Sequence, residues 1–100
     1  MKTTVTVRHM DISDAIRAHA TEKVEKMVRI FDKLVGVDVI LDESEGSHSA
    51  ELILHQIKGP QIVAEAKHAD MHTALDNVIT KMETQLRKKK GLLIEKRKQQ

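Results

Sequence analysis

The sequence predicts an α+β fold, a two-layer sandwich in which two helices cover one face of a four-stranded sheet, in the order β-α-β-β-β-α. Two segments repeat apolar residues at helical spacing, and four others alternate apolar and polar residues. Each helix has a single apolar stripe, so both stripes should bury against the same face of the sheet. One hundred residues with 40% apolar content suffice for one core. We therefore expect a single domain over residues 1–91, followed by a flexible basic tail at residues 92–100.

The first strand and the first helix each have a clear local signature. Residues 2–8 alternate polar and β-branched apolar side chains, which is typical of a strand. Ser13 is the predicted N-cap of a helix that extends to about Lys33, and Gly36 is expected to end the helical region. The apolar stripe of this helix consists of Ile16, Ala20, Val24, Met27 and Phe31.

Three further strands are predicted over residues 37–42, 48–57 and 62–67, with turns at residues 43–47 and 58–60 between them. A helix connects the first two strands of the chain, so these two should be parallel. The short turns should make the last three strands an antiparallel meander. The sheet face without helices should meet solvent through polar residues such as Thr4, Thr6, Asp38, Asp42, Glu51 and Glu65.

The last predicted helix, residues 70–90, carries most of the information about function. Asp70 is its predicted N-cap and Gly91 its predicted stop. Its apolar stripe consists of Met71, Leu75, Val78, Met82 and Leu86, so Met71 and Met82 are assigned to the core. Within this stripe and that of the first helix, the predicted contacts between helices and sheet are made by Val24, Met27, Phe31, Leu75, Val78 and Met82.

The end of this helix is strongly cationic. Residues 81–98 hold eight basic and two acidic side chains, whereas residues 1–80 hold nine basic and thirteen acidic ones. The helix macrodipole favours one or two cations at a C-terminus, but the four consecutive cations at residues 87–90 repel one another. A dense polyanion would relieve that repulsion, so the pattern favours a nucleic-acid partner.

The candidate nucleic-acid-binding residues lie on both helices. They are Lys23, Lys26, Arg29 and Lys33 on the first helix, and Lys81, Arg87, Lys88, Lys89 and Lys90 on the second. Phe31 is the only aromatic residue among Phe, Tyr and Trp, so few bases could stack on aromatic platforms. We therefore expect the contacts to run mainly to phosphate and ribose.

Neither catalysis, nor a metal site, nor a cofactor is expected. The chain has no cysteine and no glycine-rich phosphate loop. His48 and His55 point to opposite faces of one strand, while His68 and His72 straddle the start of a helix, so neither pair has metal-ligand spacing. Asp76 is interpreted as an exposed helix residue. Without a long apolar run the chain should be a soluble, unprocessed, cytoplasmic protein with no membrane partner.

The stretches ISDAIRAHATEKVEKMVRIFDKL and DMHTALDNVITKMETQLRKKK resemble the ribosome hibernation promoting factor family, also called ribosome-associated inhibitors. The resemblance covers residues 2 to about 94. It implies a monomer that binds the small ribosomal subunit through 16S ribosomal RNA, in the channel for messenger and transfer RNA. Translation would then be blocked in stationary or starved cells. The chain resembles the short form of the family, so any pairing of ribosomes would need a separate dimerising factor.

The chain departs from the resemblance at Ile30, His72 and Lys89, where many similar members carry an aromatic residue. Two alternative functions stay open. The predicted element order is also similar to that of double-stranded-RNA-binding domains, which contact ribose and phosphate across successive grooves. A protein-interaction domain is the other alternative, because a charge run is often only a solvated face.

Overall fold

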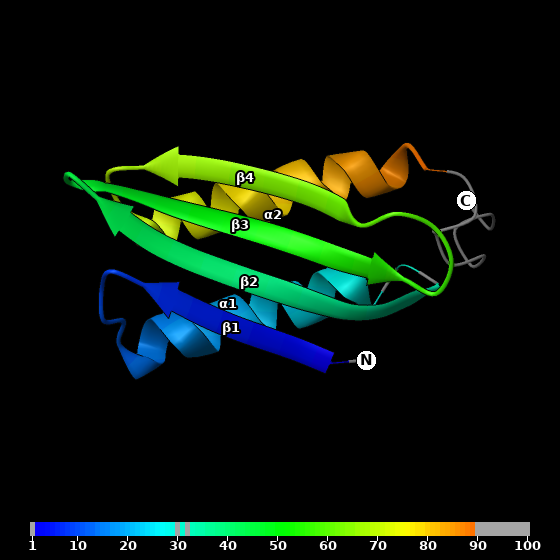
Figure 1. Ribbon diagram of the computed structural model, residues 1–100, viewed down its shortest axis with the longest axis horizontal. Coiled ribbons are helices and arrows are strands. Elements are labelled where there is room, and N and C mark those ends of the chain that lie inside the picture. Colours follow the sequence, from blue (N-terminus) through cyan, green and yellow to red (C-terminus); the bar gives the residue numbers. More distant parts are fainter. Residues whose placement is uncertain (1, 30, 32, 90–100) are drawn as a thin grey trace.

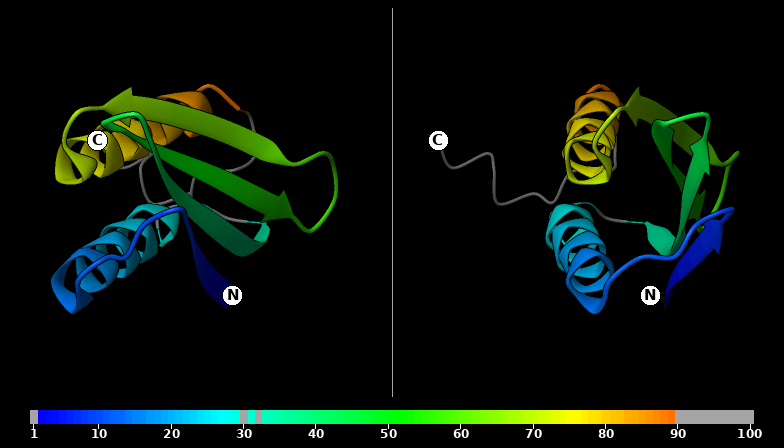
Figure 2. Two further views of the ribbon diagram at one scale, coloured as in Figure 1. Left: turned by 60° about the vertical axis from the view of Figure 1, so that its left-hand side comes forward. Right: turned by 90° about the vertical axis from the view of Figure 1, so that its left-hand side faces the viewer.

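The structure is a computed structural model that describes residues 2–29, 31 and 33–89. Its elements are β1 (Lys2–Arg8), α1 (Asp14–Val28), β2 (Leu34–Ser44), β3 (Ser47–Gln56), β4 (Ile62–His68) and α2 (Met71–Arg87). Figure 1 shows both helices behind the sheet, and the turned views in Figure 2 separate the two layers. The predicted α+β sandwich is confirmed. The expected tail at residues 92–100 lies outside the described residues.

The sheet has the strand order β1-β2-β3-β4. β1 pairs with β2 in parallel, and the pairs β2–β3 and β3–β4 are antiparallel, as predicted. The register aligns one row of apolar residues across all four strands: Val5, Val39, Leu52 and Ala64. Such a row gives the helices a continuous apolar surface on which to pack.

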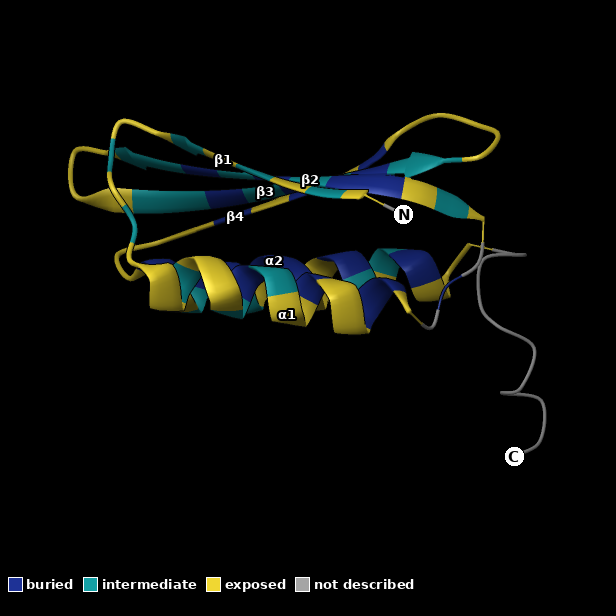
Figure 3. Cartoon of the chain, turned by 90° about the horizontal axis from the view of Figure 1, so that it is seen from below, coloured by how far each residue is buried: buried dark blue, intermediate teal, exposed yellow. Residues whose placement is uncertain are grey.

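The core lies between this sheet face and the two helices (Figure 3). Val24, Leu75, Val78 and Met82 have no exposed surface, and Met27 and Phe31 are 2% and 5% exposed, so the six predicted core residues are confirmed. Met71 is also buried. Neither of the two described helices has the length and apolar character needed to cross a membrane.

The outer face of the sheet is mostly polar and carries two histidine–aspartate pairs. His55 Nε2 lies 2.9 Å from Asp38 Oδ2, and His9 Nδ1 lies 2.8 Å from Asp42 Oδ1. Exposed residues also alternate with less exposed ones along β1 and most of β4 (Figure 3). The expectation that one face of the sheet stays open to solvent is confirmed.

α1 is shorter than predicted. It ends at Val28 with Arg29 as C-cap, so the expected continuation to Lys33 is wrong. The N–H of Phe31 donates to the Val28 carbonyl at 3.1 Å, which tightens the turn after the helix. Phe31 is nevertheless buried, because the turn directs it into the core. The apolar spacing therefore placed Phe31 correctly in the core but assigned it to the wrong element.

β2 begins at Leu34 and not at the predicted residue 37. Lys33 enters the strand with a φ of 68°, and its carbonyl accepts a hydrogen bond from the N–H of Ile57 at 2.9 Å. Gly36 lies inside β2 next to a register shift, so its predicted role as a helix stop is wrong. A Cβ there would meet the Lys2 carbonyl oxygen on β1 at 3.4 Å, which is an ordinary van der Waals contact.

The hairpin between β2 and β3 is tighter than the predicted five-residue turn. Its two central residues, Glu45 and Gly46, have φ values of 51° and 80°. Positive φ at both central positions is characteristic of a type I′ turn, whose twist matches that of the flanking strands. The strands consequently continue to Ser44 and restart at Ser47.

Both predicted helix N-caps are confirmed. The hydroxyl of Ser13 accepts from the Ile16 N–H at 3.1 Å, and Asp70 Oδ2 accepts from the Thr73 N–H and from the Thr73 hydroxyl at 2.9 Å each. α2 ends at Arg87 with Lys88 as C-cap, which is earlier than the predicted end at residue 90. The N–H groups of Lys88 and Lys89 close this end by donating to carbonyls three residues back.

The Asp70 cap leads to a prediction about acid stability. The hydrogen bond from the Thr73 N–H is the main reason that the pKa of Asp70 lies below its ordinary value. Because the pKa is lower in the folded state, this group stabilises the fold above the unfolded pKa of about 3.9 and stops doing so as pH falls through the folded pKa. Asp70→Asn keeps a capping oxygen but loses the charge, so its melting temperature should fall less steeply on acidification. Thermal melts of the parent, of Asp70→Asn and of the exposed control Asp11→Asn at decreasing pH would measure how steeply each melting temperature falls. Equal slopes for all three proteins would contradict the prediction.

Candidate nucleic-acid interface

The two helices run in the same direction, so their C-terminal ends lie at the same end of the molecule (Figure 1). The turn that begins with Arg29 and the end of α2 therefore approach each other there. Five of the predicted RNA-binding residues belong to these two segments, and all five are exposed: Arg29, Lys33, Arg87, Lys88 and Lys89. We call this set the cationic end. Lys90 lies outside the described residues.

One contact joins the two halves of the cationic end. The guanidinium carbon of Arg87 lies 6.0 Å from the centroid of the Phe31 ring, at the outer limit of a cation–π contact. Phe31 is buried while Arg87 is exposed, so the ring lies beside the charged end of a side chain that stays accessible to solvent. The contact keeps the end of α2 beside the segment that follows α1.

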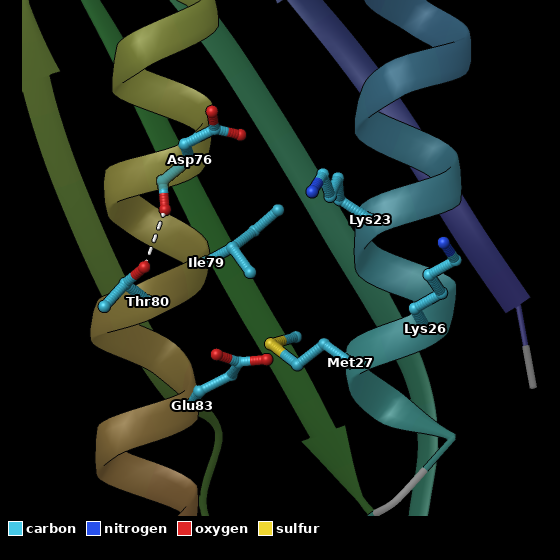
Figure 4. A pocket seen from close by; sticks show the side chains of 7 residues that line it. All are labelled: Lys23, Lys26, Met27, Asp76, Ile79, Thr80 and Glu83. Carbon is cyan, nitrogen blue, oxygen red and sulfur yellow. Dashed lines mark hydrogen bonds between the residues drawn. The ribbon is translucent and has the colours of Figure 1, made fainter.

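Lys23 and Lys26 lie on the rim of an open hollow between the helices (Figure 4). Met27 and Ile79 supply its apolar lining. The opposite rim, on α2, is formed by Asp76, Thr80 and Glu83. Lys26 also lies 3.6 Å from Glu22 of its own helix. Acidic groups thus offset the two lysines here, so the hollow is less cationic than the ends of the helices.

Lys81 lies on the other side of α2, against β4. Its ammonium group donates to the Glu65 carbonyl at 2.7 Å, and the Gln85 amide donates to the Val63 carbonyl at 3.0 Å. These side chains occupy carbonyls on the outer edge of β4, which protects that edge from pairing with another chain. The structure therefore separates Lys81 from Lys23 and Lys26, although the three share a predicted role.

The outer face of the sheet has the opposite electrostatic character. A second open hollow on this face is lined by Asp42, Ser44, Glu45, Ser47, Ser49, Glu65 and Lys67. Three carboxylates and one ammonium group would repel a phosphate backbone. The hydrogen bond from His9 is the main reason that the pKa of Asp42 lies below its ordinary value, so this carboxylate stays charged at neutral pH. A polyanion would therefore be attracted to the helix layer and not to this face of the sheet.

Sequence reasoning missed a cluster in which the two helices meet. His19 Nε2 lies 3.0 Å from Asp76 Oδ1, and His72 Nδ1 lies 3.7 Å from Asp76 Oδ2. Asp76 was predicted as an exposed helix residue, and its side chain is 47% exposed but lies close to both histidines. Histidine spacing within one segment does not reveal the cluster, because His19 is distant in sequence from His72 and Asp76. The four-residue step from His72 to Asp76, which places both on one helix face, was the available signal.

Comparisons with known proteins agree with this architecture. The sequence profile of the family described as "Sigma 54 modulation protein / S30EA ribosomal protein" matches residues 3–93. A ribosome hibernation promoting factor from Azotobacter vinelandii is 33% identical over 100 residues, covering 100% of this chain and 92% of that protein. The factor of the same name from Escherichia coli is 33% identical over 93 residues, covering 93% of this chain and 97% of that protein.

Two solved structures share the fold. A ribosomal subunit interface protein from Coxiella burnetii superposes with a TM-score of 0.77 at 27% identity, covering 88% of this chain and 96% of that one. The N-terminal domain of Protein Y from Thermus thermophilus gives 0.72 at 26% identity, covering 83% and 91%. The family profile and the full-length relatives together show that the chain belongs to the Sigma 54 modulation protein / S30EA ribosomal protein family, that of the ribosome hibernation promoting factors.

Proposed function

We propose that the protein is a cytoplasmic ribosome hibernation factor. It binds the small ribosomal subunit through phosphate and ribose groups of 16S ribosomal RNA in the channel for messenger and transfer RNA. Translation is inhibited because the bound protein occupies that channel in stationary or starved cells. Family membership supports the ribosome as the partner, since the relatives are named for ribosome hibernation.

The observation that carries the RNA-binding part of the proposal is the union of two cationic segments at one end of the helix layer. Arg29 and Lys33 lie after α1, and Arg87, Lys88 and Lys89 lie at the end of α2. The contact between Arg87 and Phe31 links the two segments. A polyanion laid across this end would contact both segments at once. The acidic outer face of the sheet then points away from the RNA.

Within this interface the predicted residues differ in their expected weight. The cationic end should contribute most, because five exposed cationic side chains gather there. Lys23 and Lys26 should contribute less, since Glu22, Asp76 and Glu83 share their surroundings. Lys81 would have to share its ammonium protons between RNA and the Glu65 carbonyl.

Salt dependence of ribosome binding provides the direct test. Binding that neutralises several phosphates releases counterions, so affinity should fall by orders of magnitude between low and moderately high salt. Co-sedimentation with ribosomes, isolated small and large subunits, and free duplex RNA at several salt concentrations measures both the slope and the partner. Salt-sensitive binding to small subunits is the expected result. Preferential binding to free duplex RNA would favour the double-stranded-RNA-binding alternative, and no binding to any RNA would favour a protein-interaction domain.

The mode of inhibition is a separate prediction. A protein that acts by occupancy must inhibit cell-free translation in proportion to the fraction of ribosomes that carry it. The protein is titrated against a known ribosome concentration, and bound protein is measured in the same samples. Inhibition should then rise together with the fraction of ribosomes that carry the protein. Strong inhibition at protein levels far below the ribosome concentration would indicate turnover and would contradict this mechanism.

A further inference from the structure

We propose that His19, His72 and Asp76 form a binding site for a divalent transition-metal ion, with zinc as the best fit, that links α1 to α2. The site goes beyond ribosome binding, since none of its three residues is a predicted RNA-binding residue, although Asp76 also lines the hollow beside Lys23 and Lys26. It also lies toward the N-terminal ends of the helices, whereas the cationic end is formed by their C-terminal ends.

The three ligand atoms are already close to a coordination geometry. His19 Nε2 is 3.0 Å and His72 Nδ1 is 3.7 Å from oxygens of Asp76, and one ligand atom from each residue lies within 4.8 Å of the others. Zinc bonds of about 2.0–2.2 Å at tetrahedral angles place ligand atoms about 3.4 Å apart. The two separations run to different oxygens of Asp76 and fall on either side of that value, so side-chain rotation would have to bring one donor atom from each residue to a single ion.

The donor set selects the class of metal. Two imidazole nitrogens and one carboxylate oxygen are the donor types found at zinc sites with three protein ligands, where water takes the fourth position. Magnesium and calcium prefer oxygen ligands throughout, so they fit this site poorly. Cobalt(II) and nickel(II) accept imidazole as well and can serve as probes.

The two rings lie against each other beside Asp76. The His19 and His72 rings are stacked, with centroids 4.0 Å apart and an angle of 22° between their planes. Both rings turn a nitrogen toward the same carboxylate. An imidazole nitrogen binds a metal along the plane of its ring, so the two rings would have to open from this stack for both nitrogens to reach one ion.

The backbone and the surface make the site accessible and partly preorganised. His72 and Asp76 lie one turn apart on α2, just after the Asp70 cap, so the helix sets their relative position. The side chains of His19, His72 and Asp76 are 19%, 53% and 47% exposed, which lets an ion enter from solvent. Because His19 belongs to α1, the bound ion would resist separation of the helices.

Zinc titration of the metal-free protein, without ribosomes, tests the site independently of the proposed function. After chelator treatment, isothermal calorimetry should show saturable binding at one ion per chain, and zinc should raise the melting temperature. Cobalt(II) should develop the visible absorption of a low-coordinate site. His19→Gln and Asp76→Asn should each weaken zinc binding by at least about 10-fold, since changes that only support a ligand already cost 10- to 100-fold. His72→Gln should weaken zinc binding too, and it should disturb folding least because His72 is the most exposed of the three residues.

His55→Gln is the matched control. It removes a histidine that lies 2.9 Å from an aspartate on the sheet, but this pair belongs to no group of three potential ligands among the described residues. Zinc affinity should be unchanged in this variant. The site is refuted if the three cluster variants, folded by circular dichroism, bind zinc as the parent does. It is equally refuted if His55→Gln weakens binding as much as they do, or if the parent shows only weak binding that does not saturate.

Discussion

Replacing Arg87, Lys88 and Lys89 with glutamate should abolish ribosome binding while the fold is retained. The change reverses three charges at the cationic end, so contacts that attract phosphate become repulsive. Glutamate has nearly the helix propensity of lysine and arginine, although negative charge at a helix C-terminus costs about 0.3–1 kcal/mol per residue. Circular dichroism should therefore show a folded protein, and co-sedimentation with small subunits should show none bound.

The matched control reverses three charges on the outer face of the sheet. Lys2, Arg8 and Lys67 are exposed on β1 and β4, and their replacement with glutamate changes the net charge by the same amount. Ribosome binding should decrease only slightly, because this face already carries acidic groups and points away from the RNA. If the first variant, while folded, sediments with small subunits at parental affinity, the RNA interface is not at the cationic end.

Phe31→Ala should destabilise the protein by about 3–5 kcal/mol, as expected for truncating a buried aromatic side chain. Phe31 is only 5% exposed and belongs to the single core cluster described above. A domain of this kind has a total stability of about 5–15 kcal/mol, so this one change removes a large part of it. Urea or thermal unfolding should show a large loss of stability.

Two further variants serve as comparisons for Phe31→Ala. Phe31→Leu keeps an apolar side chain in the core but removes the ring, so it should cost less than the alanine change. Ile57→Ala truncates a side chain that is 67% exposed and should leave stability nearly unchanged. An alanine variant at position 31 that melts like the parent would mean that Phe31 is not part of the core.

Much of the fold was predictable because its signals are local. Alternation identified the four strands, and the apolar stripes identified both helices together with the residues that they bury, such as Val24 and Met82. Ser13 and Asp70 were identifiable as caps because a capping side chain bonds to a backbone group only three residues away. Resemblance of the two helical segments to a known family was likewise visible in the sequence, and the family profile confirms it.

The end of α1 was not predictable in the same way. The apolar spacing that includes Phe31 continues the helical pattern, yet the helix stops at Val28. What decides this is the sheet: β2 starts at Leu34 with its own hydrogen bonds to β3, and the chain must turn before it. Arg29, Phe31 and Lys33 lie between the two elements, and Phe31 enters the core there.

The sequence by itself determined the class of fold, the core and the concentration of positive charge in the last helix. Only the tertiary structure decided which charges lie close together. Because the two helices run in the same direction, Arg29 and Lys33 lie at the same end of the molecule as the C-terminal end of α2. Lys81 instead lies at the edge of β4. The same packing brings His19 to His72 and Asp76. Sequence periodicity shows which residues share a face of one helix. Which residues of two helices come close depends on how their apolar stripes pack against the shared sheet.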